Sequence, residues 1–164
     1  MKTIIINSHV SIINFLHIPY DLQLQTLQWR NAPCVARYFK IPRISFETHK
    51  KWLDSLAAQP PKTIAFMIKY NEQCIGVTYF HSIDYTSQRA DWGMYIYRED
   101  FRGKGIGADV LSTLLDYATD KLNLKTVFLD VLSSNTPAVK LYEKCGFRAV
   151  ANEENSFVRY RRDL

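Results

Sequence analysis

Residues 102–107 read Arg-Gly-Lys-Gly-Ile-Gly, and the long helix that decides the fold begins inside this stretch. From Ile106 to Leu122 apolar residues recur at helical spacing, which predicts an amphipathic helix. Glycines directly before a helix leave backbone N–H groups open at the positive end of the helix dipole, where they can bind phosphate oxygens. The stretch therefore predicts a phosphate-binding loop, to which Arg102 and Lys104 add positive charge.

Three phosphate-binding motifs compete for this loop. A P-loop requires Gly-x-x-x-x-Gly-Lys-Ser/Thr, which the sequence lacks. Gly103, Gly105 and Ala108 match the dinucleotide-binding motif Gly-x-Gly-x-x-Gly/Ala in sequence. That motif normally follows an apolar strand directly, and no such strand leads into this loop. An acyl-CoA pyrophosphate loop, Arg/Gln-x-x-Gly-x-Gly/Ala, is matched by Arg102, Gly105 and Gly107, and the long helix follows it. The third motif fits best, and an ordinary loop before a helix stays as an alternative.

The elements on both sides of the loop predict a mixed α/β sheet. Before it, β-branched and aromatic runs predict an antiparallel meander, with a hairpin turn at Asn71-Glu72. After it the order is helix, strand, helix, strand, which is typical of a crossover connection. The expected strands are 11–18, 63–70, 74–83, 89–97, 126–132 and 157–161. The expected helices begin at Asp21 as N-cap, after Pro33, at Ser45, at Ile106 and at Pro137.

Composition places the chain among ordinary globular proteins. It has 164 residues, 47% hydrophobic and 23% charged, without repeats or linkers, which predicts one domain over residues 1–164. Cys34, Cys74 and Cys145 lie too far apart for a zinc site or a disulfide framework, which favours a reducing, cytoplasmic setting and no metal. The apolar run Ile4–Leu16 is interrupted by polar residues, so we expect a first strand there and neither a signal peptide nor a membrane span.

The net charge of +5 suits an anionic small molecule as well as nucleic acid. Arg159, Arg161 and Arg162 alternate with Tyr160 in the last expected strand, and a solvated strand face explains them at least as well as a nucleic-acid patch. Because no nucleic-acid-binding motif is present, we expect no nucleic-acid partner.

A second stretch supplies a family resemblance. Residues 135–147, Asn-Thr-Pro-Ala-Val-Lys-Leu-Tyr-Glu-Lys-Cys-Gly-Phe, resemble Asn-x-x-Ala-x-x-Leu-Tyr-x-x-x-Gly-Phe, the second signature of the GCN5-related N-acetyltransferase (GNAT) family. With the glycine loop at the usual separation, the resemblance covers the last three-quarters of the chain. It implies a GNAT fold, whose central mixed, mostly antiparallel sheet is flanked by helices and splayed between its fourth and fifth strands, here 89–97 and 126–132.

The resemblance implies that acetyl-CoA lies in the splayed gap. The implied contacts are Met94, Tyr95, Ile96, Arg102, Gly103, Lys104, Gly105, Ile106, Gly107, Asn135 and Tyr142.

The resemblance also implies the catalytic groups. Tyr142 occupies the position of the family's usual general acid, although a packed helix tyrosine is the alternative. For the base, Asp130 lies in an apolar strand where burial would raise its pKa, and Asp91 lies on the strand where many family members keep a carboxylate. Either acid could instead be structural. Asn135 would orient the coenzyme, cap its helix, or do both.

The first quarter of the chain is expected to bind the acceptor. The pattern at 27–33 and Ser45-x-x-x-His49-x-x-Trp52 resembles the nucleotide-linked amino-sugar acetyltransferases of pseudaminic acid biosynthesis, whose acceptor is a UDP-4-amino-4,6-dideoxy sugar. Arg30 could pair with the diphosphate, and an aromatic ring could stack on uracil or sugar. The expected acceptor residues are Trp29, Arg30, Asn31, His49, Trp52 and His81.

Other readings of these acceptor residues stay open. Both tryptophans could be core residues, and His49 could be a satisfied interface residue. A ribosomal-protein-type N-terminal acetyltransferase and a catalytically silent acyl-CoA-binding domain are the functional alternatives. A homodimer is possible.

Overall fold

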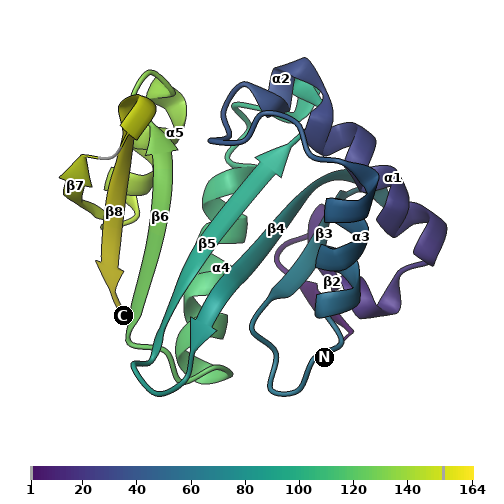
Figure 1. Ribbon diagram of the computed structural model, residues 1–164, viewed down its shortest axis with the longest axis horizontal. Coiled ribbons are helices and arrows are strands. Elements are labelled where there is room, and N and C mark those ends of the chain that lie inside the picture. Colours follow the sequence, from purple (N-terminus) through teal and green to yellow (C-terminus); the bar gives the residue numbers. More distant parts are fainter. Residues whose placement is uncertain (1, 153) are drawn as a thin grey trace.

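The computed structural model of the protein describes residues 2–152 and 154–164 and shows an eight-stranded sheet with helices on both faces (Figure 1). The strands are β1 Thr3–Ile5, β2 Val10–Asn14, β3 Ile64–Tyr70, β4 Gln73–Asp84, β5 Arg89–Ile96, β6 Thr126–Leu132, β7 Arg148–Asn152 and β8 Phe157–Asp163. The α-helices are α1 Tyr20–Asn31, α2 Pro33–Ala36, α3 Phe46–Ser55, α4 Ile106–Asp120 and α5 Thr136–Lys144, and short 3₁₀ turns cover Phe15–His17, Glu99–Phe101 and Glu154–Ser156. Of the helices described, none is long and apolar enough to cross a bilayer.

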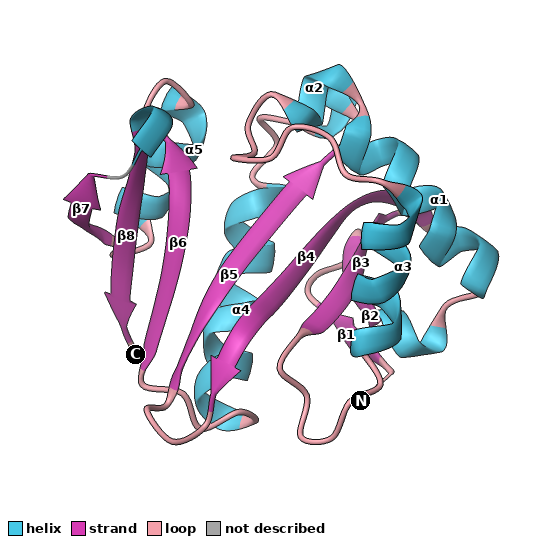
Figure 2. Cartoon of the chain, viewed as in Figure 1, coloured by secondary structure: helices cyan, strands magenta, loops and turns pink. Residues whose placement is uncertain are grey.

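The sheet is mixed, as the sequence predicts. Its strand order is β1-β2-β3-β4-β5-β6-β8-β7, and only the β5–β6 pair is parallel (Figure 2). The expected hairpin is confirmed: Asn71 and Glu72 both have positive φ, the backbone shape that suits the twist of a two-residue hairpin turn.

The single parallel pair among the described strands has only three ladder pairs, as few as the β1–β2 pair at the edge of the sheet. β5 and β6 share only the pairs Arg89–Thr126, Ala90–Val127 and Asp91–Phe128. Beyond Asp91 the two strands diverge, and a wedge-shaped opening separates them in Figure 1. The predicted splay between 89–97 and 126–132 is therefore confirmed.

Two hydrophobic cores cover the two faces of the sheet. On β3, Phe66 and Ile68 pack into the core that includes α4, whereas Ala65 and Met67 pack into the core that includes α1 and α3. This alternation follows from the two-residue period of a strand buried on both faces. The sheet is thus clamped between α4 on one side and α1 with α3 on the other, and the opening between β5 and β6 is held in a rigid frame.

The structure differs from the sequence prediction at both ends of the chain. The N-terminal run forms two strands and a 3₁₀ turn instead of one strand, because residues 7–9 separate β1 from β2. Asp21 lies in the first turn of α1 rather than at its N-cap, which is Pro19. Strand β7 was not predicted. All five of its residues are exposed, so it lacks the apolar alternation that marks a strand.

A glycine on β4 provides a test of the central pairing. A Cβ at Gly76 would lie 2.2 Å from the backbone oxygen of Tyr95 on β5, and backbone cannot yield as a side chain can. We expect Gly76→Ala to lower the free energy of unfolding by roughly 2 kcal/mol or more, within the range for overpacked cores. Chemical denaturation measures this change, and Ser112→Ala on the exposed face of α4 is the control. Equal stability of both variants would contradict the close β4–β5 approach.

Candidate active site

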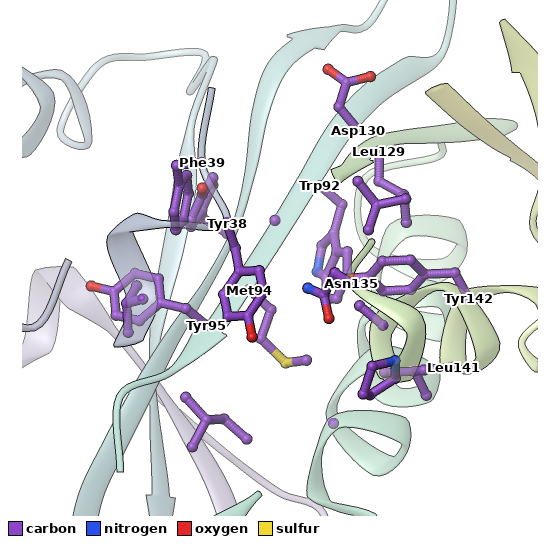
Figure 3. Close-up of a pocket in the computed structure, with 18 of the residues that line it drawn as sticks. Tyr38, Phe39, Trp92, Met94, Tyr95, Leu129, Asp130, Asn135, Leu141 and Tyr142 are labelled. Atoms are coloured by element: carbon purple, nitrogen blue, oxygen red, sulfur yellow. The ribbon is translucent and has the colours of Figure 1, made fainter. Parts of the chain in front are cut away.

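A cavity of about 920 Å³ occupies the opening between β5 and β6, and we call it the interstrand cleft. Side chains of β5 (Trp92, Met94 and Tyr95) line one side, and side chains of β6 and α5 line the other (Figure 3). Thirteen of the residues predicted from the sequence line this cleft. They are Arg30, His81, Asp91, Met94, Tyr95, Ile96, Arg102, Gly103, Gly105, Gly107, Asp130, Asn135 and Tyr142.

The glycine loop lies at the N-terminus of α4 and opens into the cleft. Gly105 is the N-cap residue with φ 79°, and Gly103 has φ 71°, values in the left-handed region that favours glycine. No atom lies within 4 Å of where a Cβ of either residue would be, so their backbones are open to a ligand. Gly107 is different, because a Cβ there would come within 3.1 Å of Met94 and 3.3 Å of Leu141. It allows α4 to approach the cleft wall.

The two cations of the loop are arranged differently. The Arg102 guanidinium donates to the backbone oxygen of Ile96 at 2.7 and 2.9 Å and to that of Cys34 at 3.1 Å. Arg102 therefore ties the end of β5 to α2. Lys104 is exposed beside the Phe101 ring and does not line the cleft, and Ile106 is a core residue.

Tyr142 and Asn135 face Trp92 across the cleft. Tyr142 meets the indole ring edge-on, with the ring centroids 5.9 Å apart, and burial raises the pKa of its hydroxyl. The phenol therefore keeps its proton at neutral pH and can donate it. Asn135 occupies the N-cap position of α5, but its side chain makes no capping hydrogen bond and lies in the cleft (Figure 3). Trp92 is 3% exposed, and its Nε1 has no hydrogen-bond partner among the described residues.

A cluster of charges closes the cleft where β5 and β6 meet. Arg159 on β8 donates to Asp91 at 2.5 Å and to Asp130 at 3.0 Å, and Lys40 donates to Asp130 at 3.1 Å. The expectation that Asp130 is buried among apolar groups is wrong: its side chain is 28% exposed and lies between two cations. Likewise, Arg159 is part of this cluster and not simply a solvated strand residue.

Tyr79 and His81 form the wall of the cleft on β4, which we call the acceptor wall because the sequence predicts that His81 binds the acceptor. Their rings lie 5.8 Å apart, and they pair with Gly93 and Asp91 on β5. Gly93 is required here, because a Cβ would come within 2.7 Å of the Tyr79 hydroxyl. The hydroxyl therefore lies directly over the β5 backbone, and burial raises its pKa.

Arg30 and Asn31 hold the segment that covers this wall. Arg30 donates to the backbone oxygens of Ile41 at 2.7 Å and Pro42 at 3.1 Å, and it stacks on Phe39. Asn31 exchanges two hydrogen bonds with the backbone of Ile44. Arg30 lines the cleft, but its described contacts are to this segment, and Asn31 acts only through the segment.

The other three predicted acceptor residues pack in or against the hydrophobic core and do not line the cleft. Trp29 is stacked on Tyr97 at 4.2 Å, and Trp52 packs edge-on against Phe15. His49 is 3% exposed, and its Nε2 lies 3.0 Å from the backbone oxygen of Gln23. Burial lowers the pKa of this imidazole. The packing of these residues supports the alternative that the tryptophans are core residues and that His49 has a structural role.

Several lining residues were not identified from the sequence. Tyr38, Phe39, Lys40 and Ile41 enter the cleft from the segment after α2, which has no periodic pattern. Tyr79 could have been found, because it precedes His81 by two residues on a predicted strand and so shares its face. No group of three or more His, Cys, Asp or Glu side chains that could hold a metal occurs among the described residues.

Comparisons with known proteins agree with this geometry. Residues 21–162 match the acetyltransferase (GNAT) domain. The chain belongs to the GNAT family of acetyltransferases. It is 30% identical over 130 residues to the acetyltransferase PseH of Campylobacter jejuni, which covers 79% of this chain and 78% of that protein.

Solved structures of GNAT acetyltransferases share the fold. C. jejuni PseH in complex with acetyl coenzyme A has a TM-score of 0.70 at 24% identity, covering 94% and 99% of the two chains. The Vibrio cholerae spermidine N-acetyltransferase bound to CoA and spermine scores 0.82 at 22% identity and covers 96% of each chain. RimL, a ribosomal L7/L12 alpha-N-protein acetyltransferase, scores 0.83 at 16% identity and covers 99% and 98%.

Asn31 offers a test of the covering segment. In Asn31→Ala the Ile44 amide loses its acceptor, so we expect its hydrogen exchange to become about tenfold faster, equivalent to one lost hydrogen bond of roughly 1.4 kcal/mol. Exchange of the β3 amides should not change. Gln28→Ala, on the exposed face of the same helix, is the control. Unchanged exchange at Ile44 would show that Asn31 does not hold the segment.

Proposed function

We propose that this acetyltransferase moves the acetyl group of acetyl-CoA to the 4-amino group of a UDP-linked 4-amino-4,6-dideoxy sugar. The observation that carries the proposal is the cationic, aromatic segment over the acceptor wall, in a chain with 30% identity to PseH. Residues 37–43, here called the cationic loop, read Arg-Tyr-Phe-Lys-Ile-Pro-Arg and contain no acid.

The interstrand cleft fits the coenzyme in three ways. The glycine loop presents open backbone at the N-terminus of α4, which suits a pyrophosphate. Past Asp91, β5 has no ladder partner on the β6 side, so its edge can pair with the amides of a pantetheine arm. The Trp92 Nε1–H lacks a partner, and a carbonyl in the cleft would satisfy it. The thioester supplies the activated acetyl group.

The charges near the acceptor wall favour an anionic acceptor over a polycation. A polyamine needs accessible carboxylates, but Asp91 and Asp130 are each already paired with a cation. The cationic loop instead places Tyr38, Phe39 and Lys40 in the cleft lining. Arg37, over the Tyr38 ring, and Arg43 are exposed on the same loop outside the lining, and this set of cations and rings suits a nucleoside diphosphate.

Tyr142 is placed to assist departure of the sulfur. Its hydroxyl stays protonated, so it can donate to a developing thiolate from the α5 side of the cleft. Because a phenol is a weaker acid than a thiol, full proton transfer must be balanced by a proton that the phenol regains from the attacking nitrogen. Tyr142 therefore acts as a relay between nitrogen and sulfur.

A competition assay tests the acceptor. Thiol release from acetyl-CoA would be measured with UDP-4-amino-4,6-dideoxy-N-acetyl-β-L-altrosamine, a ribosomal-protein N-terminal peptide and spermidine. We expect kcat/KM for the sugar to exceed the others by about 100-fold or more, the discrimination that buried polar recognition provides. Preferred turnover of the peptide or of spermidine would contradict the proposal.

If Tyr142 relays a proton, its removal should lower kcat without weakening acetyl-CoA binding. Tyr142→Phe should lower kcat by about 100-fold, the usual contribution of one proton-transfer group, while the Kd for acetyl-CoA stays within about twofold. Tyr117→Phe is the matched control, because that tyrosine lies on α4 outside the cleft. If Tyr142→Phe turns over at the wild-type rate, Tyr142 does not relay a proton.

The glycine loop predicts loss of coenzyme binding. Gly105→Glu places a carboxylate at the pyrophosphate site and strains a residue with φ 79°, so calorimetry should detect no acetyl-CoA binding. Gly105→Ala brings the strain without the charge and should weaken binding by only about fivefold, equivalent to roughly 1 kcal/mol. Equal affinities of the two variants would show that charge at this site does not matter.

A further inference from the structure

His81 lies where the cleft begins to open. It pairs across the sheet with Asp91, which is also the last residue of β5 that pairs with β6. Its ring lines the cleft on the same face as Tyr79, whose hydroxyl lies over Gly93. An acceptor that reaches a thioester held along β5 from the side of the cationic loop would pass this imidazole.

The two carboxylates beside His81 are both engaged by cations. Arg159 bonds to both Asp91 and Asp130, and Lys40 bonds to Asp130 as well. These ion pairs hold Arg159 and the adjoining strand ends in place, and His81 beside them keeps one ring nitrogen without a hydrogen bond to the described residues.

The imidazole has the geometry of a base. Its Nδ1 lies 3.2 Å from the hydroxyl of Ser82, which leaves Nε2, with no hydrogen bond to any described residue, for an acceptor. The charged groups that face it are Asp91 on β5, Asp130 on β6 and Arg159 on β8. Burial lowers the pKa of His81, and Arg159 lowers it further, while the two acids partly offset both effects. A lowered pKa favours the neutral form of the ring, which is the form that accepts a proton.

We propose that His81 is the base that takes the proton from the acceptor's ammonium group. This inference rests on the proposed transfer of acetyl to an amine, but not on the identity of the sugar. Nε2 accepts one proton, and the neutral nitrogen forms the C–N bond while the C–S bond breaks. A second proton passes from that nitrogen through Tyr142 to the sulfur, giving the amide and free thiol. Imidazolium then releases its proton to water.

The test is the pH dependence of the His81→Gln variant. We expect kcat/KM to fall about 100-fold at pH 7, as for loss of one general base, and the loss to shrink towards about pH 9.5, where the amine is already neutral in solution. A purely structural role would lower the rate equally at every pH. The matched control is His17→Gln, an exposed histidine outside the cleft, which should keep the wild-type profile.

Two acceptors separate this inference from the proposed function. The profiles would be measured with the UDP-amino sugar and with glycinamide, whose α-amino group titrates near pH 8. If only glycinamide is turned over, and His81→Gln lowers its kcat/KM mainly at low pH, the result would support His81 as the base and contradict the sugar acceptor. A pH-independent loss, or no loss, with either acceptor would overturn the assignment of His81. Unchanged acetyl-CoA affinity and thermal midpoint in His81→Gln would show that the fold is intact.

Discussion

The rest of the site depends on the early end of pairing between β5 and β6. Parallel strands normally continue their ladder, because unpaired backbone groups away from water cost free energy. Here the ladder stops after Asp91–Phe128, and the Trp92 and Tyr142 side chains meet edge-on next to the opening instead. The two cores on opposite faces hold the sheet rigid, so the opening is a fixed feature. It leaves a backbone edge whose unmet hydrogen-bonding capacity a thioester arm can use.

Ion pairs at the closed end of this opening hold the strands together and occupy both of its acids. Arg159 comes from β8, the strand that also pairs with β6, and joins the last paired residue of β5 to Asp130. The cluster thus pins the two strands at the point where they part. The same pairing occupies both acids, so the acceptor wall has no unengaged carboxylate among the described residues.

The side of the cleft formed by the glycine loop and α5 could be predicted from the sequence, because local chemistry fixes it. Glycines before an amphipathic helix and the Asn135-to-Phe147 signature each specify a conformation within a few residues of chain. The acceptor half could not be predicted in this way. Trp29, His49 and Trp52 looked like ligands, but elements far apart in sequence bury Trp29 and His49 and cover part of Trp52. Asp130 looked buried because its strand is apolar, yet the partners that pair with it come from residues 40 and 159, which no local pattern reveals.

The most direct test of the account is hydrogen–deuterium exchange with and without saturating acetyl-CoA. If the open edge of β5 holds the thioester arm, the amides of residues 94–96 and 103–107 become protected together, while those of β2 and β3 do not change. Protection of the glycine loop without any change in 94–96 would contradict the claim that the separation of β5 from β6 forms the coenzyme site.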